Sequence, residues 1–126
     1  LNKELKNHVS EEESINMANK AYLDSSAILD INQNGIKIFG LSCTGAISTD
    51  RERKGEDKAH ISLRSENKIT TYSIHFDKNN RNRITEEIII SKIIINSIAS
   101  LYDINERITL GLFKNEKFYT SHRIIK

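Results

Sequence analysis

The stretch "AHISLRSENKITTYSIHF" (residues 59–76) predicts a β-hairpin, and this hairpin decides the fold. Apolar and polar side chains alternate on both sides of "SENK", a segment rich in turn-forming residues. The positions predicted to face the core are Ala59, Ile61, Leu63, Tyr72, Ile74 and Phe76. The opposite face of the first strand carries His60, Ser62 and Arg64. We interpret His60 and His75 as exposed or half-buried sheet residues.

Upstream of the hairpin, "IKIFGLSC" (residues 36–43) predicts another strand. It is mostly apolar on both faces, which is typical of a central strand. The apolar run stops at Thr44 and Gly45, and a long polar, densely charged loop is predicted to follow as far as Lys58. Cys43 has neighbours compatible with burial, so we expect an inert core thiol.

The first helix is predicted from about Glu11 to Leu29. Ser10 lies three residues before Glu13, a capping-box spacing that satisfies free N–H groups at the start of a helix. Ser10 is therefore the predicted N-cap.

The second helix is predicted in "RITEEIIISKIIINSIASLY" (residues 83–102). Its many isoleucines are β-branched and would also suit a strand. The length of the segment, the acidic residues near its start and Lys92 in its interior favour a helix. The residues predicted to be buried against the sheet are Ile88, Ile95 and Ile98.

The tail "RITLGLFKNEKFYTSH" (residues 107–122) predicts two strand-like pieces around the turn "KNEK". We therefore expect a C-terminal hairpin extension at about residues 103–126. The order of elements is helix, three strands, helix and hairpin, which indicates an α/β domain with helices covering a mixed sheet. A chain of 126 residues is expected to form one domain, residues 1–126.

Composition limits the classes of function. The net charge of +2 comes from nearly balanced acidic and basic residues, and aromatic residues are few, so a nucleic-acid partner is not expected. No apolar run approaches the roughly 20 residues of a membrane span. A single cysteine and the absence of a secretory signal predict a cytoplasmic protein. The scattered histidines and the lone cysteine predict no metal site.

The candidate ligand site is "SCTGAISTDRERKG" (residues 42–55), where the predicted strand ends. Ligands of open α/β sheets bind beyond the carboxyl ends of strands, and a glycine lets the backbone approach a ligand closely. Ser42 and Thr44 offer hydroxyl groups, Gly45 offers an N–H, and Arg51 and Lys54 offer charge for a phosphate. The alternative is a solvated loop in which acidic and basic side chains screen one another. A threonine nucleophile would need an adjacent base, and spacing alone identifies none.

Three segments, about residues 10–102 together, resemble the C-terminal domain of the CinA family. One branch of that family has a strand end that reads roughly G-x-x-C-T-x-x-(x)-x-T-D-R-x-x-K-G. The matching positions here are Gly40, Cys43, Thr44, Thr49, Asp50, Arg51, Lys54 and Gly55. The family includes nicotinamide-nucleotide amidohydrolases, and the residues after Asp103 match no segment that the resemblance covers.

The resemblance implies a three-layer α/β/α sandwich that converts nicotinamide mononucleotide to nicotinate mononucleotide and ammonia. It implies Thr44 as a catalytic residue and Ser42, Gly45, Arg51 and Lys54 as substrate-binding residues, with no cofactor. The partner is then a small-molecule nucleotide. The Gly-Pro-rich part of the family's loop is replaced here by a bulkier charged segment without proline.

The family's enzymes also place a serine in an S-C-T-G-G segment that would lie upstream of Leu1. We therefore expect a domain lacking that N-terminal segment, incomplete or inactive as it stands. It would form a homo-oligomer or associate with the missing segment. The alternative is a noncatalytic module of a larger protein, which binds a nucleotide or another protein.

Overall fold

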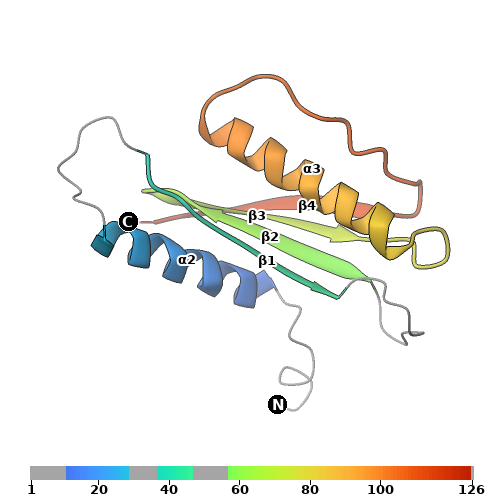
Figure 1. Ribbon diagram of the computed structural model, residues 1–126, viewed down its shortest axis with the longest axis horizontal. Coiled ribbons are helices and arrows are strands. Elements are labelled where there is room, and N and C mark those ends of the chain that lie inside the picture. Colours follow the sequence, from blue (N-terminus) through green and yellow to red (C-terminus); the bar gives the residue numbers. More distant parts are fainter. Residues whose placement is uncertain (1–10, 29–36, 47–56, 126) are drawn as a thin grey trace, which may run out of the picture.

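The computed structural model describes residues 11–28, 37–46 and 57–125. Two helices and four strands lie in these ranges (Figure 1). In chain order they are α2 (Glu11–Ile28), β1 (Gly40–Ala46), β2 (Lys58–Arg64), β3 (Lys68–His75), α3 (Arg83–Leu101) and β4 (Lys117–Ile124). The strands form one sheet in the order β1-β2-β3-β4. The protein is thus a small α/β domain built on a four-stranded antiparallel sheet.

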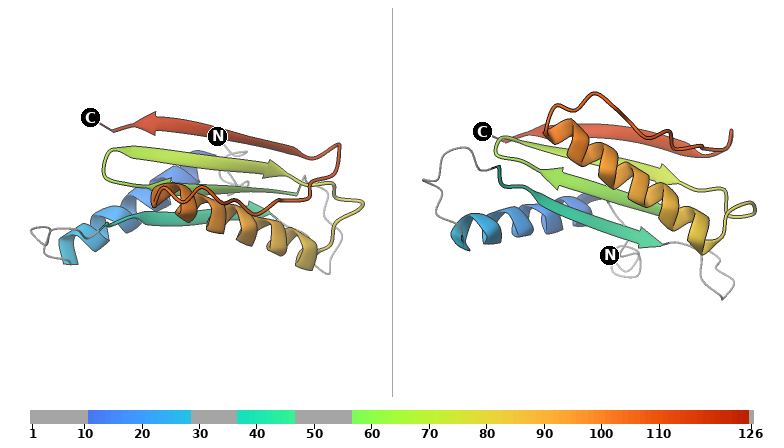
Figure 2. Two further views of the ribbon diagram at one scale, coloured as in Figure 1. Left: turned by 90° about the horizontal axis from the view of Figure 1, so that it is seen from above. Right: turned by 45° about the horizontal axis from the view of Figure 1, so that its top comes forward.

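The two helices lie on opposite faces of this sheet, as the views of Figures 1 and 2 show. Ser14 of α2 contacts Ser42 of β1 and Ser62 of β2. On the other face, Ile89 and Ile93 of α3 belong to the apolar core of the domain. The remaining fully buried members of that core are Ala59, Ile61, Ile74 and Phe76. Side chains alternate along a strand, so each strand supplies residues to both helix interfaces.

The described sheet is antiparallel throughout, so the predicted mixed sheet is wrong for these strands. The reason lies in the return segment, residues 104–116, which has no regular secondary structure beyond a turn at Lys114 and Asn115. It runs back along α3 to the end of the sheet where β3 finishes (Figure 2). There Lys117 pairs with His75, and β4 leaves in the direction opposite to β3.

The predicted C-terminal hairpin extension differs from the structure for the same reason. The first of its two expected strands is the return segment, and the second is β4, which pairs with β3. Alternating apolar residues in "RITLGLF" (residues 107–113) therefore reflect packing rather than a strand. Leu110 and Leu112 are the partly buried side chains of this segment that pack against the core.

The helix at residues 83–101 is confirmed, but the prediction of its buried face is wrong. Ile88 is 48% exposed and Ile95 is 51% exposed, whereas Ile89 and Ile93 are 2% and 1% exposed. Ile98 is only partly buried. Isoleucines lie around more than half of this helix, so periodicity cannot select one stripe. The positions of the sheet and the return segment select it instead.

The other elements lie close to their predicted positions. The first helix covers Glu11–Ile28, and the hairpin pairs as expected. The strand predicted at residues 36–43 is displaced to Gly40–Ala46. A Cβ atom at Gly40 would come within 2.2 Å of the Ala18 carbonyl oxygen, so this glycine lets α2 pack directly on β1. The predicted cap, Ser10, lies outside the described residues.

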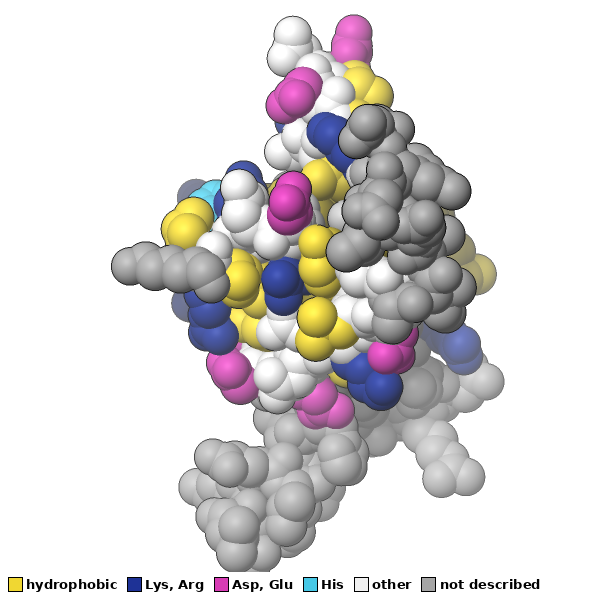
Figure 3. Space-filling model, turned by 90° about the vertical axis from the view of Figure 1, so that its left-hand side faces the viewer, with side chains coloured by type: hydrophobic (Ala, Val, Ile, Leu, Met, Phe, Trp, Pro, Cys, Tyr) yellow, Lys and Arg dark blue, Asp and Glu magenta, His cyan; other side chains and the backbone are white. Residues whose placement is uncertain are grey.

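Neither α2 nor α3, the helices in the described ranges, is long and apolar enough to cross a bilayer. At the end of the molecule where β1 begins, acidic and basic side chains are interspersed around hydrophobic ones (Figure 3). The described residues visible at this end form no extended surface of a single charge sign.

Candidate functional site

The sheet face that carries α2 is rich in hydroxyl groups. The register places one row of such residues directly across the four strands: Ser42, Ser62, Thr71 and Ser121. Ser14 of α2 meets this row, with its Oγ 3.1 Å from Ser42 Oγ and 2.9 Å from Ser62 Oγ. Ser62 Oγ in turn lies 2.8 Å from Thr71 Oγ1. This buried network positions α2 on the sheet.

Ser42, a predicted substrate-binding residue, is part of this network. Its side chain donates a hydrogen bond to the Ser14 carbonyl oxygen at the helix interface. The residue is 7% exposed. Its hydroxyl is thus engaged inside the protein, and Ser42 contributes to the site by holding α2 in place.

The next row on the same face contains the predicted catalytic residue. Thr44 of β1 is the direct register partner of His60 on β2, and His60 is the partner of Ser73 on β3. Alternation along each strand turns these three side chains to the same face of the sheet. The row ends at Tyr119 on β4, and we call it the threonine–histidine row: Thr44, His60, Ser73 and Tyr119.

His60 is held in one orientation. Its Nδ1 lies 2.7 Å from Ser73 Oγ, a distance typical of a short hydrogen bond. Burial lowers the pKa of His60, nearby Lys58 lowers it further, and Glu11 opposes this shift. The imidazole is therefore neutral at neutral pH, which is the form that can accept a proton.

Exposure changes steeply along this row. Thr44, His60 and Ser73 are 8%, 5% and 1% exposed, whereas Tyr119 at the β4 edge is 47% exposed. The Tyr119 hydroxyl lies 3.3 Å from His75 Nε2, and the two rings stack with centroids 5.9 Å apart. The row therefore runs from a dry interior at β1 to an open aromatic edge at β4.

The other predicted residues take different places. Gly45 follows Thr44 in β1 and is exposed, and its register partner is Ala59. Arg51 and Lys54 lie outside the described residues. Cys43 is exposed rather than buried in the core, and it lies on β1, an edge strand of the described sheet.

Sequence reasoning missed His60 and Ser73 as parts of this site. A signal existed, because alternation in the hairpin puts both on the face opposite the apolar core. Without the pairing of β1, nothing in the sequence placed Thr44 beside His60. The row is thus a product of register between strands that a long segment separates.

In the ranges that the structure describes, no three His, Cys, Asp or Glu side chains are grouped so that they could hold a metal ion. The row itself offers hydroxyl groups and an imidazole, with the ammonium group of Lys58 near His60. No family model, curated protein or solved structure gives a significant match to this chain.

Proposed function

We propose that this chain is a CinA-like domain that binds a pyridine mononucleotide at the threonine–histidine row and hydrolyses its amide. The observation that carries this proposal is the register of Thr44 opposite His60. A threonine nucleophile needs a base beside it, and His60 is a neutral imidazole on the adjacent strand. The order of elements and the helices on opposite faces of the sheet support the three-layer arrangement that the CinA resemblance implies.

The three buried residues of the row have roles in amide hydrolysis. His60 accepts the proton of the Thr44 hydroxyl while the threonine oxygen attacks the amide carbonyl carbon. The C–N bond then breaks, and the proton passes to the leaving nitrogen, which departs as ammonia. Water hydrolyses the resulting ester and restores the hydroxyl. Ser73 holds the imidazole ring through its contact with Nδ1.

The substrate contacts complete the proposal. Gly45 lets the backbone approach the nucleotide, and Arg51 and Lys54 bind its phosphate. The reaction needs no cofactor, and a nucleotide pool of this kind is cytoplasmic. Ser42 keeps α2 in place beside the row.

A noncatalytic binding module is the second candidate. The observation that favours it is the low exposure of Thr44 and His60, 8% and 5%, which limits access of a scissile amide to the hydroxyl. A module of this kind would bind the nucleotide at the exposed Tyr119 edge without turnover.

Ammonia release from nicotinamide mononucleotide tests the proposal, with binding measured in parallel by calorimetry. We expect turnover by the parent chain and a loss of at least about 100-fold in Thr44→Val, the range of general-base and nucleophile contributions. Thr120→Val is the matched control, because Thr120 is exposed on β4. The rate should fall as pH drops below the ordinary histidine value of 6.5, with an apparent pKa lower than that value.

The outcomes separate the candidates. Binding without ammonia release, unchanged in Thr44→Val, supports the noncatalytic module. If the parent neither binds nor hydrolyses the nucleotide, both candidates are wrong for this chain.

A further inference from the structure

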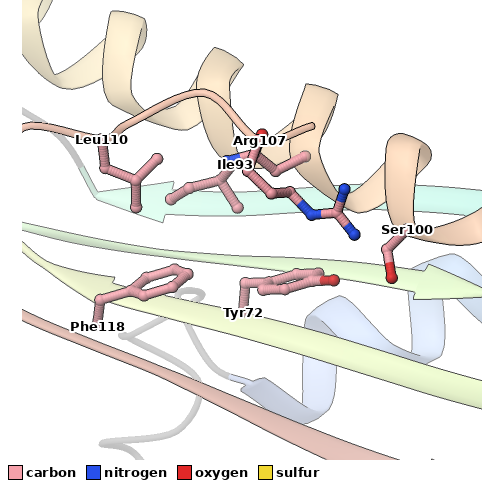
Figure 4. A pocket seen from close by; sticks show the side chains of 7 residues that line it. Tyr72, Ile93, Ser100, Arg107, Leu110 and Phe118 are labelled. Carbon is pink, nitrogen blue, oxygen red and sulfur yellow. The ribbon is translucent and has the colours of Figure 1, made fainter. Parts of the chain in front are cut away.

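A cavity of about 200 Å³ lies on the α3 side of the sheet, between α3, β3, β4 and the return segment (Figure 4). It lies on the sheet face opposite the threonine–histidine row. Its lining residues are Tyr72, Ile93, Asn96, Ser100, Arg107, Leu110 and Phe118. The cavity combines two aromatic rings, aliphatic walls and one cationic side chain.

The floor of the cavity is a flat aromatic surface. The rings of Tyr72 on β3 and Phe118 on β4 are nearly parallel, with an interplanar angle of 8° and centroids 6.2 Å apart (Figure 4). Ile93 of α3 and Leu110 of the return segment lie across the cavity from these rings. A planar ring between these surfaces would stack on the floor and exclude water.

The walls are fixed by hydrogen bonds. The side-chain amide of Asn96 donates to the Ile108 carbonyl oxygen at 2.9 Å and accepts from the Ile108 N–H at 2.8 Å. This double contact fastens the return segment to α3. The cavity therefore exists before any ligand arrives, which reduces the ordering cost of binding.

Arg107 gives the cavity its charge. Its Nη1 donates to the carbonyl oxygens of Ile104 and Glu106, which fixes one edge of the guanidinium. The side chain extends toward Ser100 at the cavity (Figure 4). Burial raises the pKa of the Tyr72 phenol, so this hydroxyl stays protonated and can donate a hydrogen bond. An anionic group would find a cation and two hydroxyl groups at this end.

We propose that this cavity is a binding site for a small aromatic carboxylate with a single ring. The aromatic floor selects a planar apolar body, and Arg107 with Ser100 selects the carboxylate. Pockets for drug-sized ligands occupy about 300–1,000 Å³, so the smaller volume here limits the ligand to one ring.

Titration with benzoate tests the site, followed by amide chemical shifts in ¹⁵N-labelled protein. Benzoate should saturably shift the signals of Ser100, Arg107 and Phe118. Benzamide, which has the same shape without the charge, should bind about tenfold more weakly, as loss of a hydrogen bond to a charged group implies. Arg107→Gln should reduce benzoate to the affinity of benzamide.

Arg83→Gln is the matched control, because Arg83 is exposed on α3 and pairs only with Glu87 among the described residues. It should leave both affinities unchanged. Phe118→Leu should weaken both ligands alike, because it removes one ring of the aromatic floor and keeps the charge. If Arg107→Gln changes the spectrum throughout the protein, Arg107→Lys, which retains the cation, should still prefer benzoate to benzamide. Equal binding of the two ligands by the parent, or shifts confined to other residues, would overturn the proposal.

Discussion

The two faces of one sheet are joined to their helices by different chemistry. On the α3 face, Ile61 and Ile74 of the sheet pack with Ile89 and Ile93 of the helix. On the α2 face, the helix also buries Ile15 and Ala18, but its side-chain hydrogen bonds to the sheet include a buried hydroxyl network centred on Ser14. Both faces are dry, and both arise from the same alternating strands.

The comparison of the two faces distinguishes interactions that stabilise the fold from interactions that fix the position of a helix. Isoleucine packing is non-directional, and each buried side chain contributes about 1.5–3 kcal/mol. A hydroxyl hydrogen bond contributes only about 0.5–1.5 kcal/mol net, but it requires its partner at one distance and angle. Apolar packing on the α3 face therefore stabilises the domain without requiring one exact position, whereas the hydroxyl network on the α2 face fixes where its helix lies. That second property is what a site on the α2 face needs.

The largest expected effect concerns a buried ion pair between the loop that precedes α3 and the return segment. Arg81 binds Glu116 through two hydrogen bonds, Nε to Oε2 at 2.8 Å and Nη2 to Oε1 at 2.7 Å. The side chains are 8% and 0% exposed. Arg81→Gln leaves a buried carboxylate without its cation and should lower the free energy of unfolding by about 3–5 kcal/mol. Urea denaturation measures this change.

The control for that variant is Arg83→Gln, whose exposed pair with Glu87 should contribute less than about 1 kcal/mol.

The pH dependence of the free energy of unfolding provides a second check. Burial alone would raise the pKa of Glu116, but hydrogen bonds from Arg81, Asp77 and Phe113 outweigh it and lower the pKa. The contribution to stability is thus present above the ordinary value of 4.5 and is lost as pH falls below it. Equal effects of the two arginine variants would contradict this account.

The second prediction concerns the apolar face itself. Ile93→Ala should lower the free energy of unfolding by about 2–5 kcal/mol, because Ile93 is 1% exposed and lies in the core. Ile95→Ala, two residues along the same helix, should change it by no more than about 0.5 kcal/mol, since Ile95 is 51% exposed. Thermal or urea denaturation of the pair decides which stripe of α3 faces the sheet. A larger cost at Ile95 would place the helix in the orientation that periodicity alone predicted.

The sequence predicted those features of the fold that depend on local patterns. The bounds of α2 and α3 and the pairing of β2 with β3 follow from periodicity and turn residues, and the structure confirms them. The predictions from sequence failed for features that depend on contacts between distant segments of the chain. The return segment determines the direction of β4, and the positions of the neighbouring elements determine which isoleucines of α3 are buried.

The candidate site shows the same limit. Thr44 was identified from the residues that end an apolar run, and the structure places it within β1. His60 was interpreted as an ordinary sheet residue. Its place beside Thr44 depends on the pairing of β1 with β2, which local sequence patterns do not predict. Ser42 was taken for a ligand contact, although its hydroxyl serves the helix interface. Hydroxyl residues have no sequence period that distinguishes these two uses.

The smallest of the three effects tests the hydroxyl face. Ser62 is 0% exposed and lies within hydrogen-bonding distance of both Ser14 and Thr71. Ser62→Ala removes one oxygen and leaves both partners with one contact fewer in a dry interface, so the free energy of unfolding should fall by about 1–3 kcal/mol. Ser91→Ala, at an exposed position of α3, makes the same chemical change outside the network and should have almost no effect.

Hydrogen exchange of the backbone amides then tests whether the network positions α2. If the network mainly positions α2, then Ser62→Ala should speed amide exchange in α2 more than the global loss of stability explains, whereas α3 should exchange at the rate set by global unfolding. Uniform acceleration across both helices would mean that the hydroxyl face contributes stability alone, and the contrast between the two faces would then be one of magnitude rather than of role.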